Sequence, residues 1–174
     1  MPALRRHPDF PCAAVAGIDV EVERPAAGRL LLRYRLSGVT PGLLLTPGPA
    51  ARTDELWRHT CLEAFVQAPP DAGYREINLA PGGGWAAYRF EGRRDGMANA
   101  EMGPPVVQAT GPEDITAVWD LDLPADRAWR VGVSAVIEEV GGRLSYWALA
   151  HPPGRPDFHN PDCFVLQLPA PGAS

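Results

Sequence analysis

The sequence predicts an all-β fold, an antiparallel β-sandwich of two sheets (immunoglobulin- or jelly-roll-like) with few short helices, and three observations support it. Several segments alternate apolar and polar residues with a period of two, which is typical of half-buried strands. The 20 prolines and 18 glycines indicate many turns and short elements. The hydrophobic fraction of 45% and the charged fraction of 21% are those of an ordinary globular chain. At 174 residues we expect one domain, over residues 1–174.

The individual strands follow from alternation and from turn residues. In the segment 29–36, every second residue is Leu or Tyr, and the residues between them include two arginines. The run Pro81-Gly82-Gly83-Gly84 and the pair Gly141-Gly142 separate alternating segments, which predicts two hairpins. The looser stretches 41–53 and 93–114 are expected to be surface connections. The expected strands are 29–36, 59–67, 74–80, 85–92, 115–123, 129–139, 144–150 and 163–168.

The segment LWRHTCLEAFVQ (56–67) fits two kinds of secondary structure. Its apolar residues match helical spacing, and Asp54 could cap such a helix. Its second half also alternates as a strand does, with Leu62, Ala64 and Val66 on one face. Because the neighbouring segments are all strands, we favour a strand here, paired as a hairpin with 74–80.

Composition excludes several classes of function. The net charge of −5 and a pI near 5.3, without any basic run, argue against a nucleic-acid partner. No stretch approaches the ~18 apolar residues of a membrane span, and the N-terminus does not resemble a signal peptide. Three cysteines without a CxxC pair suggest reduced thiols. We therefore expect a soluble, cytoplasmic protein without a membrane partner.

Polar side chains on two neighbouring predicted strands suggest a ligand-binding groove. His59 and Glu63 share a strand face, and Glu76 and Asn78 share a face of the next strand. The proline-rich loop 151–163 adds His151 and His159, and such loops often carry binding residues. The alternative is a polar sheet face that only meets solvent.

Five tryptophans also require an explanation. Trp119 and Trp129 lie on apolar strand faces and are expected in the core. Trp57, Trp85 and Trp147 lie near turns, where an indole could stack on a sugar ring, although core packing remains open for each. The predicted ligand site comprises Trp57, His59, Glu63, Glu76, Asn78, Trp85, Tyr88, His151 and His159.

Catalytic and metal sites have weaker support. Structural zinc sites usually show closely paired ligands, which are missing around His59, Cys61, His151, His159 and Cys163, so no metal is predicted. Ser134 lacks the glycine pattern of a nucleophile elbow. We favour a non-catalytic binding module over an enzyme that uses Cys61, Glu63 and histidines. A partner-binding domain with an empty groove is the third interpretation.

The motifs LWRHTCLEAFV, YREINLAPGGGWAAYRFEG, SAVIEE and SYWALAHPPGRPDFHNPDCFVLQL, in this order, resemble bacterial DOMON-like domains related to the family 9 carbohydrate-binding modules. The resemblance runs from about Arg52 to Leu168. It implies a β-sandwich with a ligand site on one concave face and its loops, and relatives bind sugars or haem.

Two features of the sequence depart from this resemblance. His59-Thr60-Cys61 stands where the sugar-binding relatives have an acidic pair, which bears on calcium and sugar specificity. Haem as a cofactor would need axial ligands, for which Met97, Met102, His151 and His159 qualify by type only. No CxxCH attachment motif is present. A sugar or another small polar ligand therefore ranks above haem.

Overall fold

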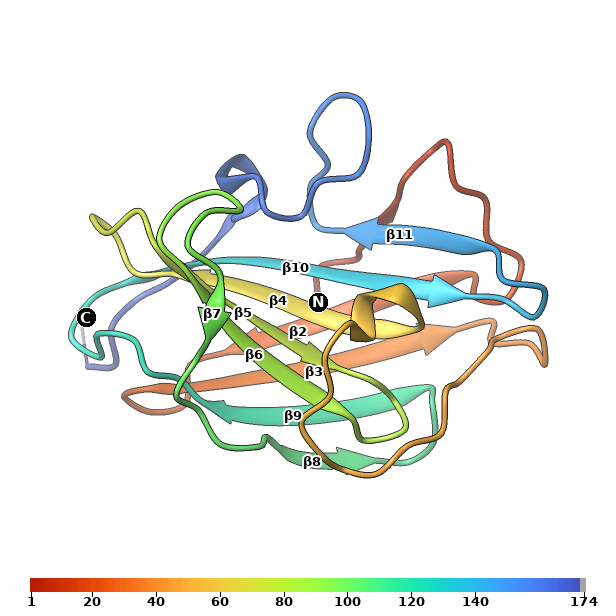
Figure 1. The fold of residues 1–174 in the computed structure, drawn as a ribbon, viewed down its shortest axis with the longest axis horizontal. Coiled ribbons are helices and arrows are strands. Elements are labelled where there is room, and N and C mark those ends of the chain that lie inside the picture. The colour runs from red at the N-terminus through yellow and green to blue at the C-terminus, as the bar shows by residue number, and fades with distance from the viewer. Residues whose placement is uncertain (173–174) are drawn as a thin grey trace.

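The structure is a computed structural model, and it describes residues 1–172. Two antiparallel sheets pack face to face, as Figure 1 shows. The larger sheet has the strand order β1-β11-β10-β4-β5-β6-β7, with β12 also paired to β10, and the smaller has the order β2-β3-β9-β8. The only helices within these residues are two three-residue 3-10 turns. The predicted all-β sandwich is confirmed.

The alternation of apolar and polar residues explains which side chains of the smaller sheet face the core. In β3 (Arg29–Ser37), Leu30, Leu32 and Tyr34 are buried, and the residues between them are partly exposed. This strand pairs with β2 (Gly17–Glu23) and β9 (Asp114–Asp120), and β8 (Val106–Ala109) forms the edge.

The sequence did not predict β2 or β8. The strand β8 lies within the stretch 93–114 that was expected to be a surface connection, which is wrong at this point. All four residues of β8 are exposed, so no apolar alternation marks the strand.

The larger sheet is built around β4 (Cys61–Gln67), which lies between β10 (Trp129–Glu138) and β5 (Tyr74–Leu79). The expected hairpins β5–β6 and β10–β11 are confirmed. The other strands of this sheet are β1 (Arg5–Arg6), β6 (Trp85–Phe90), β7 (Ala98–Asn99), β11 (Leu144–Ala148) and β12 (Leu166–Leu168). The last is shorter than the expected strand at 163–168, because Pro161–Cys163 forms a 3-10 turn capped by the Asn160 side chain.

The strand interpretation of the segment 56–67 is confirmed, with the strand beginning at Cys61. A 3-10 turn (Leu56–Arg58) precedes it, without a side-chain cap. Asp54 does not cap this turn, because its carboxylate accepts a 2.6 Å hydrogen bond from the Tyr88 hydroxyl. All seven residues of β4 are buried, so both faces of this strand are covered.

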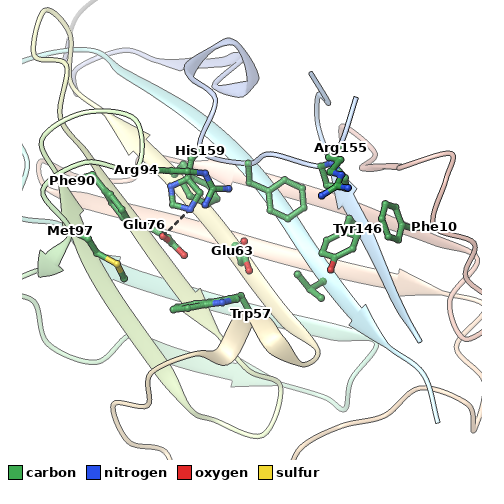
Figure 2. A pocket seen from close by; sticks show the side chains of 14 residues that line it. Phe10, Trp57, Glu63, Glu76, Phe90, Arg94, Met97, Tyr146, Arg155 and His159 are labelled. Carbon is green, nitrogen blue, oxygen red and sulfur yellow. Dashed lines mark ion pairs between the residues drawn. The ribbon is translucent and has the colours of Figure 1, made fainter. Parts of the chain in front are cut away.

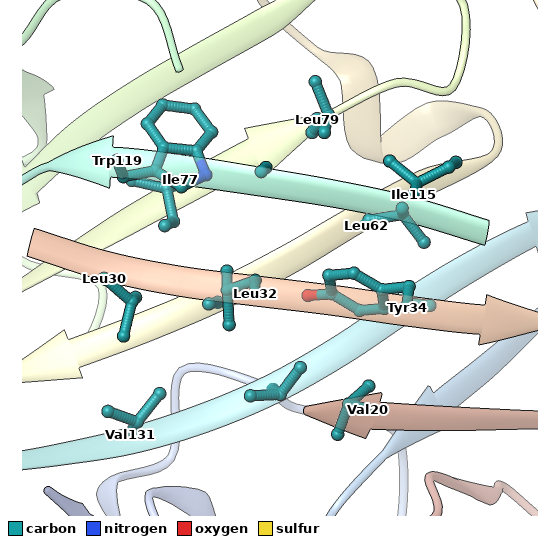
Figure 3. Packing of buried hydrophobic residues seen from close by; sticks show 14 of the residues in the cluster. Val20, Leu30, Leu32, Tyr34, Leu62, Ile77, Leu79, Ile115, Trp119 and Val131 are labelled. Carbon is teal, nitrogen blue, oxygen red and sulfur yellow. The ribbon is translucent and has the colours of Figure 1, made fainter. Parts of the chain in front are cut away.

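The core fills the space between the two sheets (Figure 3). Leu30, Leu32 and Trp119 of the smaller sheet lie opposite apolar residues of the larger one, such as Leu62 and Ile77. The inner face of β4 supplies Leu62, Ala64 and Val66 to this core, so Cys61, Glu63 and Phe65 point to the opposite, outer face of the larger sheet. Trp119 and Trp129 are buried in this core, as expected.

No helix within residues 1–172 is long and apolar enough to cross a membrane.

Candidate functional site

A cavity of about 710 Å³ lies over the outer face of the larger sheet. Figure 2 shows its floor carboxyls, Glu63 and Glu76, between Trp57 on one side and His159 on the other. Its apolar lining comes from Phe10, Trp57, Phe65, Phe90, Met97, Val136, Tyr146, Pro156 and Phe158. Its polar lining comes from Glu63, Glu76, Arg94, Arg155 and His159.

Glu63 is placed on the cavity floor by the alternation of β4, and it is only 2% exposed. Ser134, its register partner on β10, donates a 3.3 Å hydrogen bond from its hydroxyl to Glu63 Oε2. Glu63 Oε1 has no hydrogen-bond partner among residues 1–172. Burial, and next the nearby charge of Glu76, raise the pKa of Glu63 to about 8. At neutral pH this carboxyl is therefore mostly protonated.

Glu76 is the second floor carboxyl and is 3% exposed. The Asn78 amide donates to Glu76 Oε1 at 2.9 Å, and His159 Nε2 lies 3.6 Å from Glu76 Oε2. Burial raises the pKa of Glu76 to about 7, although the hydrogen bond from Asn78 and the charge of Arg94 oppose the shift. The two floor carboxyls therefore titrate as an interacting pair close to neutral pH.

His159 reaches the cavity from the loop 151–159 and packs between Phe65 and Phe90, at ring-centroid distances of 4.9 and 5.0 Å. Its Nδ1 atom lies 2.8 Å from the Tyr74 hydroxyl. Burial, followed by the positive charge of Arg94, lowers the pKa of His159 to about 4. The imidazole is therefore neutral at physiological pH, and its contact with Glu76 is not an ion pair there.

Two loops are joined above the floor by charged hydrogen bonds. Arg94 Nη2 donates to Asp157 Oδ1 at 3.0 Å, and Arg93 donates to the other carboxylate oxygen. Burial alone would raise the pKa of Asp157, but the hydrogen bonds from the two arginines hold it below its ordinary value. This link holds the Arg94 turn against the loop that carries His159. Arg155, from the same loop, is exposed and completes the polar rim.

The structure brings together four of the nine predicted site residues as cavity lining: Trp57, Glu63, Glu76 and His159. Two others support them from behind. The Tyr88 ring packs edge-on to Trp57 at a centroid distance of 5.9 Å, and Asn78 positions Glu76. Of the predicted groove of Trp57, His59 and Glu63 with Asn78 and the 151–159 loop, the structure brings all but His59 together.

The other three predicted residues lie outside this lining. His59 is at the start of β4, where its Nδ1 lies 2.7 Å from Glu138 Oε2. Trp85 faces the inter-sheet core, and its ring centroid is 6.2 Å from that of Trp119, because it shares the inner face of β6 with Ala87. His151 packs back on the N-terminal segment, with Nε2 2.8 Å from the Arg5 carbonyl oxygen.

Sequence reasoning missed several lining residues. Phe10 and Tyr146 come from segments far apart in the chain, and only the sheet order brings them to one cavity. Arg94 lies in a stretch that was expected to be a surface connection, so nothing singled it out. The loop 151–163 was expected to contribute to the site, and it supplies Arg155 and Phe158 as well as His159 to the cavity lining.

Haem and metal ligands can be compared with this geometry. Of the four candidate axial ligands, Met97 and His159 line the cavity. Both ring nitrogens of His159 already face protein groups, Tyr74 and Glu76, so this histidine does not fit an axial ligand. Within residues 1–172, no three His, Cys, Asp or Glu side chains converge in a way that could hold a metal ion.

Comparison with known proteins gives one informative similarity. No protein-family model matches the chain, and no curated protein matches it. A crystal structure of a protein from Bacteroides uniformis, provisionally described as carbohydrate-binding, is similar to this fold with a TM-score of 0.62. The two sequences are 13% identical, and the match covers 88% of this chain and 78% of the other. At this identity the similarity establishes a shared fold.

Proposed function

We propose that the protein is a ligand-binding module and that its cavity takes a carbohydrate or a similar small polar ligand. The observation that carries the proposal is a single cavity combining aromatic walls with a buried polar floor. Its volume of about 710 Å³ is within the range of small-molecule sites. The resemblance to DOMON-like domains and family 9 carbohydrate-binding modules, and the fold shared with the Bacteroides uniformis protein, support the same proposal.

The wall residues suit the apolar faces of a sugar ring. Trp57 is partly exposed and lines the cavity (Figure 2), and the Tyr88 ring packs edge-on to its indole. A flat aromatic face stacks on C–H groups, while Glu63 and Glu76 offer hydrogen-bonding atoms to hydroxyls. Trp57, Glu63 and Glu76 would therefore contribute to binding such a ligand without any catalytic step.

Catalysis by Cys61 is disfavoured by its surroundings. Burial, and next the charges of Glu63 and Glu76, raise the pKa of the Cys61 thiol well above its ordinary value. A nucleophilic cysteine needs the opposite shift, because the thiolate is the reactive form. The remaining enzyme alternative is acid–base chemistry by the two floor carboxyls, whose raised pKa values favour it as the second candidate.

The test is a thermal-shift screen of neutral sugars, sugar nucleotides and haem, followed by calorimetry on each ligand that binds. Trp57→Ala should weaken binding by roughly ten-fold or more, the effect of about 1.4 kcal/mol. Trp57→Phe should retain part of the affinity. Arg58→Ala is the matched control. Arg58 follows Trp57 in the sequence, but its side chain is 65% exposed and does not line the cavity.

Each alternative has its own signature in the same experiments. Unchanged affinity in Trp57→Ala would remove the stacking role. A Soret band in the purified protein would favour the haem-binding alternative. Turnover of a bound sugar that disappears in Glu63→Gln while binding persists would establish the acid–base enzyme.

A further inference from the structure

The cavity floor contains a carboxyl oxygen that the protein leaves without a hydrogen-bond partner. Glu63 is 98% buried (2% exposed), and within residues 1–172 no group donates to its Oε1 atom. Leaving a buried carboxyl oxygen unpaired costs on the order of 1–3 kcal/mol. Glu63 lines the cavity, so its carboxyl group borders the space that a ligand would occupy. Once ionised, this carboxyl only accepts hydrogen bonds, so the arrangement suits a ligand group that donates and that stabilises the ionised form.

The donors beside the floor are already engaged. The single hydroxyl hydrogen of Ser134 is directed at Glu63 Oε2, and the Asn78 amide donates to Glu76 Oε1. The Cys61 thiol beside Glu63 is a weak donor and lies 3.8 Å from the Leu62 carbonyl oxygen. Four carboxyl oxygens thus share few protein donors. A ligand hydroxyl brings one hydrogen, whereas an ammonium group brings three. The number of acceptor oxygens on the two carboxyls therefore favours an ammonium group over a single hydroxyl.

The charges around the floor favour the same group. Cys61 beneath it and the phenols of Tyr74 and Tyr88 have raised pKa values, mainly through burial, and are uncharged at neutral pH. His159 is neutral because burial lowers its pKa to about 4.

The arginines near the floor do not replace a ligand cation. Arg93 and Arg94 are both hydrogen-bonded to Asp157, and Arg155 is an exposed residue of the rim. Arg94 favours the ionised form of Glu63, but burial and the charge of Glu76 outweigh it and raise the pKa of Glu63 to about 8.

The walls around the carboxyls also suit a cation. Trp57, Phe65 and Phe90 line the cavity beside Glu63 and Glu76. The faces of such rings attract ammonium groups, and the attraction grows when the cation is desolvated. A cation between the carboxyls and these rings would contact favourable groups on both sides.

We propose that Glu63 and Glu76 form a subsite for a protonated primary amine, so that the ligand is an amino sugar or a similar ring carrying an amine. The sugar ring of this ligand rests on the proposed function, and its amine rests on the residues of the cavity floor. When the amine binds, the carboxyls ionise and release protons to the solvent. Affinity should therefore rise from pH 6 to pH 8 for an amine that remains protonated over this range.

The experiment compares matched probes by calorimetry. Glucosamine, galactosamine and mannosamine are each titrated beside the parent hexose and the corresponding uronic acid, and cyclohexylamine is titrated beside cyclohexanol. We expect at least one amine to bind roughly ten-fold more tightly than its uncharged partner at pH 7. The preference should be lost in Glu63→Gln, which keeps the size of the side chain. Glu101→Gln, at an exposed position, should retain it.

The outcomes separate the inference from the proposed function. Parent hexoses that bind as well as the amino sugars, or a preference for uronic acids, would overturn the amine subsite while leaving carbohydrate binding in place. Cyclohexylamine binding without any sugar binding would support the subsite and contradict the carbohydrate. Failure of every amine to bind overturns the subsite. Measuring heats in two buffers of different ionisation enthalpy checks the proton release, which a merely structural role of Glu63 would not produce.

Discussion

The hydroxyl of Tyr34, in the smaller sheet, donates a 2.7 Å hydrogen bond across the core to the backbone carbonyl oxygen of Glu63, in the larger sheet. Tyr34 is 2% exposed, so this bond forms away from solvent. It connects the core directly to the strand that carries the cavity floor.

Tyr34→Phe should reduce the free energy of unfolding by about 1–2 kcal/mol, because a buried hydrogen bond is lost with little change in packing. Chemical denaturation of the two proteins measures the difference. Tyr146→Phe is the control, since the Tyr146 side chain is only partly buried, and it should change stability by much less. Equal effects of the two substitutions would contradict a role for the bond.

Glu63→Gln should stabilise the protein, and the gain should grow as pH rises from 5 to 8. The folded protein holds a proton on Glu63 up to about pH 8, whereas the unfolded chain loses it near 4.5. The free energy of unfolding of the wild type therefore falls through this window, and glutamine removes the part of the dependence that comes from Glu63, while that from Glu76 remains. We expect a gain on the order of a few kcal/mol at pH 8. Melting curves at several pH values test it, with Glu101→Gln as the control.

His159 should remain neutral until the pH is close to 4. Its pKa is lowered from an ordinary 6.5 by burial first and then by Arg94. The unfolded chain takes up this proton at higher pH than the folded one, so stability is lost as pH falls from about 6.5 to 4. Titration of the imidazole resonances by NMR gives the midpoint directly. A midpoint near 6.5 would contradict the buried, uncharged state.

Gly132→Ala should destabilise the protein by about 1–3 kcal/mol, the usual cost of overpacking. A Cβ atom at this position would lie 2.8 Å from a ring carbon of Phe164 and 3.1 Å from the Cys163 carbonyl oxygen. Since Phe164 stacks on Phe65 beside the cavity, the shift should also reach the floor. Gly103→Ala is the control, because a Cβ atom there meets nothing within 4 Å. Thermal melts of both variants provide the comparison.

Asp157→Ala should loosen the two loops above the floor. It removes the acceptor of Arg93 and Arg94 and leaves two positive charges side by side. Amide hydrogen exchange over residues 91–97 should accelerate, and ligand affinity should fall. Asp162→Ala, an exposed carboxylate in the same chain segment, should leave exchange in 91–97 unchanged.

Alternation predicted the strands that are buried on one side, and it failed where burial is uniform. In β3, Leu32 and Tyr34 are buried and their neighbours Leu31, Arg33 and Arg35 are partly exposed, so a period of two is visible in the sequence. In β4 every residue is buried, and both strand and helix spacings fit. For β4, the strand was predicted from the neighbouring strands, and this prediction is confirmed. The exposed edge strand β8 has no buried face to produce a pattern.

The site was partly predictable for a related reason. Glu63 and Asn78 are register partners on adjacent strands, a relation that hairpin pairing supplies from sequence alone. The contribution of Phe10 depends on how β1 joins the far edge of the sheet, which local patterns do not contain. His59 was misplaced because the strand begins two residues later than expected, so strand alternation does not extend to it.

The division of the cavity between sheet and loops has a consequence for how such a protein could diversify. Glu63 and Glu76 belong to the central strands, whose backbone cannot move without disrupting the core beneath them. Trp57, Arg94 and the residues around Arg155 belong to turns and loops, which tolerate substitution and insertion. New ligand preferences could therefore evolve by exchange of rim residues over an unchanged acidic floor. Homologues would then share the recognition of one ligand group and differ in the body of the ligand attached to it.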